Sequence, residues 1–191
     1  MDQQFKNHSE QLWKDPKGAD ERFFGFNVKS KLVQEKFFQS PFIHKVHDLY
    51  EKGSQKSMFT MAGRIRFKDE NLGSGQGWHR DRVDFKQSKS IIYLTDTDGQ
   101  NGPSQYIEKS HKPLAMFKDY LRYGISLKDS RITDAQAQQI IASESHRLKT
   151  FHAPAGTLLF VDTRGIHRGH PLIGGERYAL TNYIWYNMST Q

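Results

Sequence analysis

A histidine and an aspartate two positions apart, His79 and Asp81, are the residues of this chain that most directly suggest metal chemistry. In a β-strand, residues i and i+2 point to the same face, so this pair would direct an imidazole and a carboxylate into one volume. A third ligand from a distant strand is needed to complete a site. Two histidines and one carboxylate, with the remaining positions open, form the ligand set of non-haem Fe(II) oxygenases.

The chain has nine histidines from which the third ligand could come. His167 and His170 lie just after the stretch GTLLFVDTRG, which reads as an apolar strand that ends at the mouth of a barrel. We expect His167 to be the third ligand, with His170 as the alternative.

An arginine, Arg177, follows His167 by ten residues and opens the last long strand. Two antiparallel strands joined by a short turn would bring these two side chains into one cavity. A 2-keto acid chelates a metal through its keto group and one carboxylate, and its far carboxylate suits the bidentate fork of a guanidinium. Taken alone, Arg177 is more simply explained by a surface salt bridge with Glu176 or Asp162.

Five further positions are weaker candidates for contacts with a co-substrate or substrate. Arg64 and Arg66 alternate on the strand before the His-x-Asp motif and could both face inward, although an outward face on an edge strand is the simpler interpretation. Tyr93 could donate a hydrogen bond to the co-substrate, and Thr181 follows Arg177 on the same strand. Core packing is the alternative for both. Gly169 could leave room for a co-substrate beside His167 or could serve a turn.

The order of the predicted elements indicates an antiparallel β-sandwich or barrel with helices packed outside it. Residues 28–39 and 41–52 favour helices, the second with Ser40 as N-cap and Pro41 at its first position. About eight short strands are expected from Met58 onward, interrupted by a helical insertion at about 113–143. The predicted organisation is one domain over 1–191, with residues 1–57 as a helical support for a β-core at 58–191.

The composition restricts the possible classes of function. The absence of cysteine excludes disulfides, thiolate metal sites and thiol nucleophiles. The net charge of +7 favours anionic partners, but the basic residues are dispersed, so a nucleic-acid partner is unlikely. No apolar run approaches the roughly 20 residues of a membrane span, and the start MDQQFKNHSE lacks a signal-like apolar core. A cytoplasmic protein is therefore expected.

Three stretches together resemble the phytanoyl-CoA dioxygenase family of 2-oxoglutarate oxygenases. They are GWHRDRVDF, KSIIYLTDTDGQNGPSQYIEKSHK and GTLLFVDTRGIHRGHPLIGGERYALTNYIWYN. The resemblance runs from about Arg64 to Asn187. It is specific because the motifs agree in order and spacing: Trp before His-x-Asp, then Asn-Gly-Pro, Ser-His-Lys, Gly-Thr-Leu-Leu, and His-Arg-Gly ahead of the arginine.

The resemblance implies a mainly β fold with flanking helices, the double-stranded β-helix, a cupin-like jelly roll. It also implies that His79, Asp81 and His167 bind Fe(II), and that Arg177 binds 2-oxoglutarate, which is used together with O2. Tyr93, Arg66 and Thr181 are the further residues expected around the co-substrate. Relatives that halogenate replace the carboxylate ligand with a small residue, so the intact Asp81 favours hydroxylation or a related oxidation.

Two other classes of protein stay open. A cupin-like hydrolase or isomerase would use the same ligands without a keto acid, and Arg177 argues against it. A sensing or binding module would keep the fold without catalysis, and the complete ligand set argues against that. The expected partner is a small molecule, with an anionic one favoured, whereas the substrate itself and the choice between monomer and dimer do not follow from the sequence.

Overall fold

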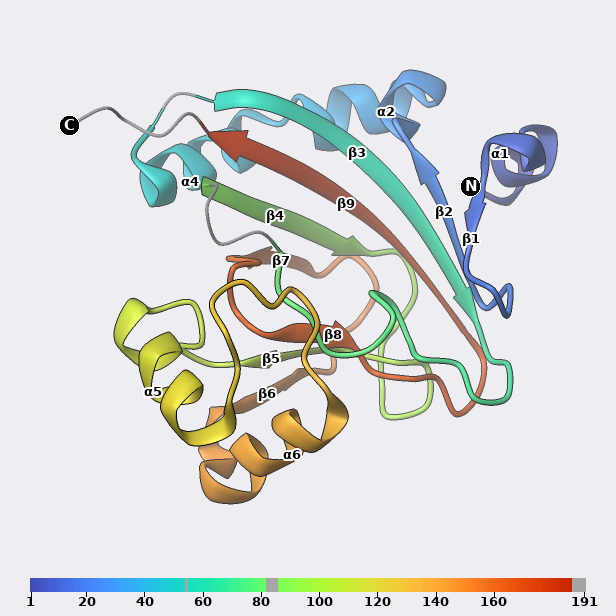
Figure 1. Ribbon diagram of the computed structural model, residues 1–191. Helices are drawn as coiled ribbons and strands as arrows, with labels where there is room; N and C mark the ends of the chain where they lie inside the picture. Colours follow the sequence, from blue (N-terminus) through green and yellow to red (C-terminus); the bar gives the residue numbers. More distant parts are fainter. Residues whose placement is uncertain (54, 82–85, 187–191) are drawn as a thin grey trace.

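The computed structural model describes residues 1–53, 55–81 and 86–186, in which two antiparallel β-sheets face one another. The larger sheet has the strand order β1-β2-β3-β9-β4-β7, and the smaller sheet has the order β6-β5-β8 (Figure 1). The strands are β1 (Trp13–Lys14), β2 (Asp20–Phe24), β3 (Gln55–Arg66), β4 (Lys86–Tyr93), β5 (Ser104–Ile107), β6 (Leu148–Phe151), β7 (Leu158–Val161), β8 (His167–Gly169) and β9 (Glu176–Tyr186).

The helices cover the outer sides of both sheets. In Figure 1, the N-terminal helices lie along the larger sheet, and α5 and α6 lie beside the smaller one. The helical elements are α1 (Asp2–Asn7), η1 (Ser9–Gln11), α2 (Phe26–Lys29), α3 (Lys31–Val33), the π-helical η2 (Gln34–Phe38), α4 (Pro41–Glu51), α5 (Pro113–Tyr123), α6 (Asp134–Ser143) and η3 (Ser145–Arg147). This layering confirms the predicted double-stranded β-helix, a jelly roll with flanking helices.

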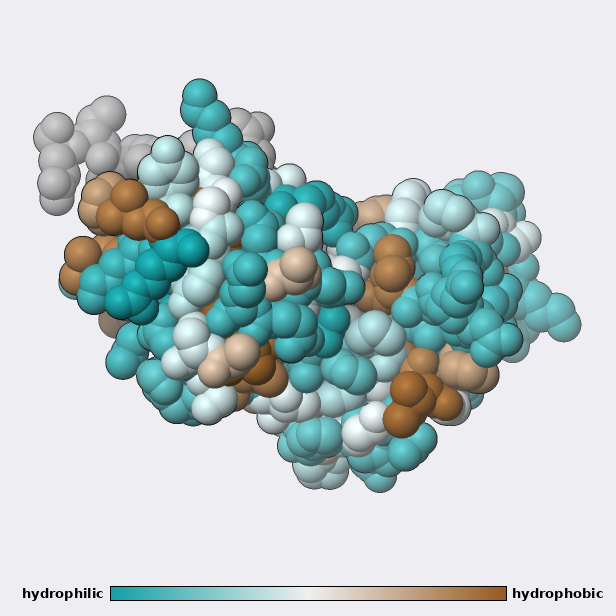
Figure 2. Space-filling view, turned by 60° about the horizontal axis from the view of Figure 1, so that its bottom comes forward, coloured by the Kyte–Doolittle hydropathy of each residue, from teal (hydrophilic) through white to brown (hydrophobic). Residues whose placement is uncertain are grey.

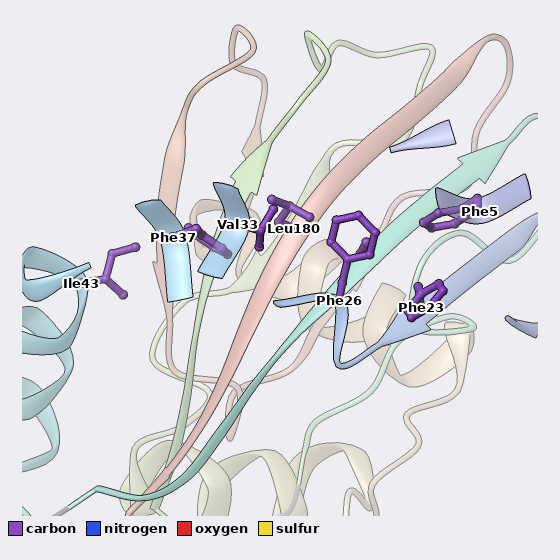
Figure 3. Packing of buried hydrophobic residues seen from close by; sticks show 8 residues of the cluster. Phe5, Phe23, Phe26, Val33, Phe37, Ile43 and Leu180 are labelled. Carbon is purple, nitrogen blue, oxygen red and sulfur yellow. The ribbon is translucent and has the colours of Figure 1, made fainter. Parts of the chain in front are cut away.

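The outer face of the larger sheet packs against the N-terminal helices through an apolar cluster. Leu180 of β9 belongs to a buried cluster made largely of aromatic residues, and Figure 3 shows its labelled side chains in a row along the sheet. The buried members are Phe5, Phe23, Phe26, Val33, Phe37, Ile43, Ala62 and Leu180. Because strand residues alternate between faces, the neighbours of Leu180 on β9, Ala179 and Thr181, point to the inner side, toward the smaller sheet.

A second buried cluster supports the smaller sheet from the side of α5 and α6. It includes Trp78, just before the His-x-Asp motif, and Ile166, just before His167. Ile140 of α6 is fully buried in the same cluster. Trp78 is thus a core residue, and the cluster anchors the backbone on which two of the expected ligands lie.

The N-terminal region differs from its prediction. Residues 1–57 contain helices, but β1 and β2 also add two strands to the larger sheet, and β3 begins at Gln55. The helix expected over 28–39 consists of three short pieces, α2, α3 and η2. The sequence pattern missed β2 because its register against β3 is a long-range pairing, which local periodicity does not encode.

Other local predictions agree with the structure. The side chain of Ser40 accepts a hydrogen bond from the Ile43 backbone N–H, and Pro41 opens α4. Lys52, with φ 50°, ends this helix in the left-handed conformation. Residues 82–85 of the stretch GWHRDRVDF and Asn187 at the end of the last expected strand lie outside the described residues.

The molecular surface in Figure 2 is largely hydrophilic, and hydrophobic residues occur on this face as separate patches. Scattered apolar residues are normal on a folded protein and do not by themselves indicate a docking surface. Within the described part of the chain, none of the helices combines the length and the apolar character that a bilayer span requires.

Candidate metal centre

The structure brings His79, Asp81 and His167 together, although His167 is far from the other two in the sequence. His79 and His167 exchange two backbone hydrogen bonds of 2.9 and 2.8 Å, and the Asp81 backbone N–H donates to the Thr163 carbonyl oxygen. One potential ligand atom from each of the three side chains lies within 4.8 Å of the others. His170 is not part of this group, and its Nδ1 lies 2.8 Å from the Pro171 carbonyl oxygen.

The two imidazoles are held in the tautomer that a metal requires. Nδ1 of His79 lies 3.0 Å from the carbonyl oxygen of Gly77, and Nδ1 of His167 lies 2.8 Å from that of Gly165. A carbonyl only accepts, so each Nδ1 carries the proton and each Nε2 keeps its lone pair. Metal-binding histidines are commonly oriented by such a contact from the second ring nitrogen.

Burial keeps both imidazoles neutral. Burial lowers the pKa of His167 to about 4, and the positive charge of Lys89 acts in the same direction. The pKa of His79 is also lowered, first by burial and then by His167 and Lys89. Both rings are therefore unprotonated at neutral pH, the form in which imidazole binds a metal ion.

The carboxylate of Asp81 is held by two side chains of β4. The ammonium of Lys89 lies 2.6 Å from Oδ2, and the amide of Gln87 donates to the same oxygen at 3.1 Å. Burial opposes ionisation of Asp81, but Lys89 and His167 outweigh it and lower the pKa of this carboxyl. Because both contacts use Oδ2, Oδ1 is left to face a metal ion.

Lys89 is itself buried and charged. Burial opposes its charge, but attraction by Tyr183 and Asp81 raises its pKa, so this side chain is a cation at neutral pH. Its ammonium lies 4.3 Å from the centre of the Tyr183 ring, a distance typical of a cation–π contact. No sequence motif singles out Lys89 as a residue of the metal centre.

The glycine-rich loop NLGSGQG packs directly on the metal centre. Gly75 has φ +87°, a conformation that side chains rarely adopt, and a Cβ at this position would overlap with Cε1 of the His79 ring. The guanidinium of Arg131 donates hydrogen bonds to the carbonyl oxygens of Gly75 and Gln76. The loop therefore covers one ligand closely, which explains why glycine is needed there.

Arg177 lines the same cavity as two of the candidate ligands, His79 and His167. Its side chain is 6% exposed, and Nη1 has no hydrogen-bond partner among the described residues. Burial lowers the pKa of this guanidinium. An unpaired buried donor on a charged group is costly, so this position fits an anion that the protein chain does not itself provide.

Gly169 of β8 makes room for that guanidinium. A Cβ at Gly169 would lie 2.8 Å from Nη2 of Arg177 and 2.7 Å from Cβ of Ser74. Gly169, which could leave room for a co-substrate beside His167, thus lies against the guanidinium of Arg177.

Tyr93 and Thr181 also line the cavity on the inner face of the larger sheet. The Tyr93 hydroxyl accepts a hydrogen bond of 3.1 Å from the Ser104 backbone N–H. Its own proton remains available for a ligand. Thr181 lies opposite Ile91 in the strand register, between the ends of the sheet where Arg177 and Lys89 lie.

Arg64 and Arg66, for which an outward face was the simpler interpretation, both bind carboxylates. The Arg64 guanidinium binds Glu21 at 2.5 Å and Asp2 at 2.9 Å. Arg66 is half-exposed and pairs with Glu176 at 3.3 Å. Arg66 does not line the cavity, which corrects the expectation that it contacts the co-substrate.

A charged pair from the N-terminal region contributes to the cavity and was also missed. Asp20 and Arg22 of β2 lie on the inner face and bind one another at 2.5 Å. The stretch DERFF shows no alternation of charged and apolar residues, and only the pairing of β2 with β3 decides which face Asp20 and Arg22 occupy. The same is true of Lys89, a lysine within the apolar run KSIIYL.

The cavity has a volume of about 110 Å³ and is lined by residues of both sheets. His79 and His167 line it, with Asp81 beside them, and Arg177 lines it from the inner face of the larger sheet. This arrangement could hold a divalent metal ion together with a small dianion that bridges the metal and the guanidinium.

Comparison with known proteins gives one family. A family model described as phytanoyl-CoA dioxygenase (PhyH) matches residues 2–177, nearly the whole chain. No curated protein sequence matches.

Solved structures share the fold at low sequence identity. The epimerase SnoN from nogalamycin biosynthesis, described as non-haem and α-ketoglutarate-dependent, has 13% identity and a TM-score of 0.66, with 99% of this chain and 72% of that chain covered. HygX from Streptomyces hygroscopicus, with nickel, 2-oxoglutarate and hygromycin B bound, has 15% identity and a TM-score of 0.60, covering 97% and 78%. EctD from S. alaskensis, with bound iron, has 14% identity and a TM-score of 0.64, covering 93% and 61%. At these identities, the likeness shows the fold.

Proposed function

The chain belongs to the phytanoyl-CoA dioxygenase family, and from this premise we propose that it is an iron(II)- and 2-oxoglutarate-dependent oxygenase that oxidises a small organic molecule. The observation that carries the proposal is the buried guanidinium of Arg177, which lines the same cavity as His79 and His167 and whose Nη1 has no partner among the described residues. A protein that used only the metal would have no need for this buried cation.

The residues present fit the metal. His79 and His167 offer Nε2 lone pairs because their Nδ1 atoms are bound to backbone carbonyls. Asp81 offers Oδ1, while Lys89 and Gln87 hold Oδ2. Iron(II), when bound together with 2-oxoglutarate, supplies the activation of O2 that couples decarboxylation of the keto acid to oxidation of the substrate.

The protein's own contribution is to bind and orient the co-substrate. The Arg177 fork would receive the far carboxylate of 2-oxoglutarate, and the Tyr93 hydroxyl is placed to donate to the same ligand. Gly169 permits this position of the Arg177 guanidinium, because a side chain at residue 169 would overlap with Nη2. Thr181 lines the space between Arg177 and Lys89.

We propose hydroxylation as the outcome, because Asp81 provides the carboxylate ligand that halogenating relatives lack. The structural neighbours include proteins described as an epimerase and a carbocyclase, so the outcome requires a direct test. A gain of one oxygen in the product indicates hydroxylation. A product without added oxygen would instead indicate desaturation, cyclisation or epimerisation.

The test of the proposed function is release of succinate from 2-oxoglutarate by the full chain with Fe(II), ascorbate and O2. Anaerobic addition of 2-oxoglutarate to the Fe(II) protein should also produce the visible absorption band of the chelate. If Fe(II) binds but neither signal appears, the rival metal-only function replaces this proposal. If succinate is released, a screen of small organic acids, amines and neutral metabolites for a change in mass identifies the substrate class.

A further inference from the structure

The inner face of the larger sheet carries cations at both ends, and only one of them is explained by the co-substrate. Arg177 and Tyr183 are six residues apart on β9, which corresponds to about 20 Å along a strand. Lys89 is the direct register partner of Tyr183 on β4. Lys89 contacts the candidate ligand Asp81, whereas Arg177 lies beside Gly169, two residues after the candidate ligand His167.

The charges of the proposed complex sum to one unit of excess positive charge. Iron(II) and the 2-oxoglutarate dianion cancel one another, and Asp81, which is paired with Lys89 at 2.6 Å, offsets only one of the two cations Lys89 and Arg177. Asp20 and Arg22 cancel as a pair, and Arg64 is bound to Glu21 and Asp2. Arg168, the remaining cation among the described residues of the cavity, lies 3.5 Å from Asp134.

A buried ammonium without a counter-ion is unfavourable, because a low-dielectric environment penalises an uncompensated charge. Without the metal, Asp81 neutralises Lys89 at 2.6 Å. With iron bound to Asp81, the same carboxylate is shared with a dication and compensates the lysine less. The loaded site therefore favours one additional negative charge beside Lys89.

The surface next to Lys89 is aromatic. The rings of Phe59 and Tyr183 stack with centres 4.9 Å apart and planes inclined by 11°, and Trp185 lies 6.0 Å from Tyr183 at 21°. All three are half-buried, on residues of β3 and β9 that share the inner face with Lys89. A ligand anchored at Lys89 would have these rings beside its apolar part.

We infer that the substrate of this site is a small organic monoanion, whose carboxylate binds Lys89 and whose apolar body lies against Phe59, Tyr183 and Trp185. This inference rests on the proposed function, because the excess charge at Lys89 arises once iron and 2-oxoglutarate are bound. It assigns the two buried cations to different ligands: Arg177 to the co-substrate and Lys89 to the substrate.

The inference is tested by calorimetric binding of three matched probes to the full chain loaded with Fe(II) and 2-oxoglutarate under anaerobic conditions. Phenylacetate carries the charge, phenylacetamide is its neutral counterpart, and phenethylammonium carries the opposite charge. A charge-assisted hydrogen bond should make phenylacetate bind about 10- to 100-fold more tightly than phenylacetamide. Phenethylammonium should bind most weakly.

Variants separate the charge from the apolar contact. Lys89→Met should abolish the preference for phenylacetate over phenylacetamide, and Lys89→Arg should restore much of it. Tyr183→Leu should weaken both probes by a similar factor. Lys149→Met is the matched control, since Lys149 lies on the smaller sheet, outside this cavity, paired with Glu108. Circular dichroism and Fe(II) titration verify that each variant is folded and loaded.

Two results would overturn the inference: wild-type protein that does not prefer phenylacetate, or a Lys89→Met variant that keeps the preference. Failure of the proposed function is seen separately, because the absorption band of bound 2-oxoglutarate is recorded in the same samples before any probe is added. A normal band with no anion preference refutes only the assignment of Lys89.

Discussion

The two faces of the larger sheet, built from the same strands, have opposite characters. The outer face packs aromatic and aliphatic side chains, among them Phe23 and Leu180, against the N-terminal helices, which contribute Phe26. The inner face buries charges: Arg177 without a partner on Nη1, and Lys89 against Asp81. Burying apolar area stabilises the fold, whereas burying charge costs free energy unless the charge is compensated.

This difference shows how the fold separates stability from chemistry. β9 contributes to both faces, because Leu180 points outward while Arg177, Thr181 and Tyr183 line the cavity. Substitutions on the outer face should therefore change the free energy of unfolding and leave ligand affinity intact. Substitutions on the inner face should instead change ligand affinity and leave the free energy of unfolding intact. Four predictions test this division, in order of decreasing effect.

The largest effect is expected for Asp81→Ala. The variant removes the one anionic ligand of the candidate site, so Fe(II) binding and succinate release should fall to background, while the fold persists. It also leaves Lys89 without its carboxylate partner. Calorimetric titration measures Fe(II) binding, and circular dichroism measures whether the variant is folded. Wild-type turnover in this variant would place the metal elsewhere.

On the outer face, Phe26→Ala should lower the free energy of unfolding by about 3–5 kcal/mol, because it opens a cavity among packed rings. Phe26 is 3% exposed, and its ring centre lies 5.7 Å from that of Phe23. Denaturant unfolding measures the loss. Leu114→Ala on the exposed surface of α5 is the control and should change stability by less than about 0.5 kcal/mol. Weaker Fe(II) binding by the folded Phe26 variant would contradict the separation of the faces.

Arg177→Ala should weaken 2-oxoglutarate binding by about 30- to 1,000-fold, equivalent to roughly 2–4 kcal/mol for a truncated charged partner. Fe(II) affinity should stay near wild type, because Arg177 is not a ligand. Arg177→Lys should recover part of the loss, since it keeps the charge without the fork.

Anaerobic titration of the Fe(II) protein with 2-oxoglutarate measures this difference. Arg66→Ala is the matched control, because Arg66 points outward to Glu176 and should leave the titration unchanged. An unaltered curve for Arg177→Ala would remove the main support for 2-oxoglutarate as co-substrate.

The smallest effect concerns His47 of α4, which is 2% exposed and packs on the outer side of the sheet. Burial, followed by the charge of His44, lowers the pKa of His47 to about 4. The unfolded chain, with a histidine pKa near 6.5, binds the proton more readily. Stability should therefore be full above pH 6.5 and fall as the pH drops toward 4, by at most about 3 kcal/mol from this group.

His47→Gln should reduce that loss, since glutamine does not titrate, while the exposed His146→Gln should not. The comparison is made by denaturant unfolding at pH 7 and pH 4.5. Equal pH dependence in wild type and His47→Gln would show that His47 is solvated enough to titrate normally.

The sequence by itself predicted the candidate ligand set and the fold class. His-x-Asp places two side chains on one face of any strand, and the order of Asn-Gly-Pro, Gly-Thr-Leu-Leu and His-Arg-Gly motifs is typical of the family to which the chain belongs. The N-cap of α4 at Ser40 was also predictable from local sequence, because it needs only the Ser40 side chain and a backbone N–H three residues later. These features depend on neighbours in the chain.

Only the tertiary structure decided which buried charges face the cavity. The pairing of β2 with β3 turned Asp20 and Arg22 inward, and the register of β3 against β9 turned Arg66 outward. Lys89 reached Asp81 because β4 lies between β7 and β9. A shift of one residue in a strand register reverses every side chain, and long-range pairing sets that register, so local sequence could not fix these positions.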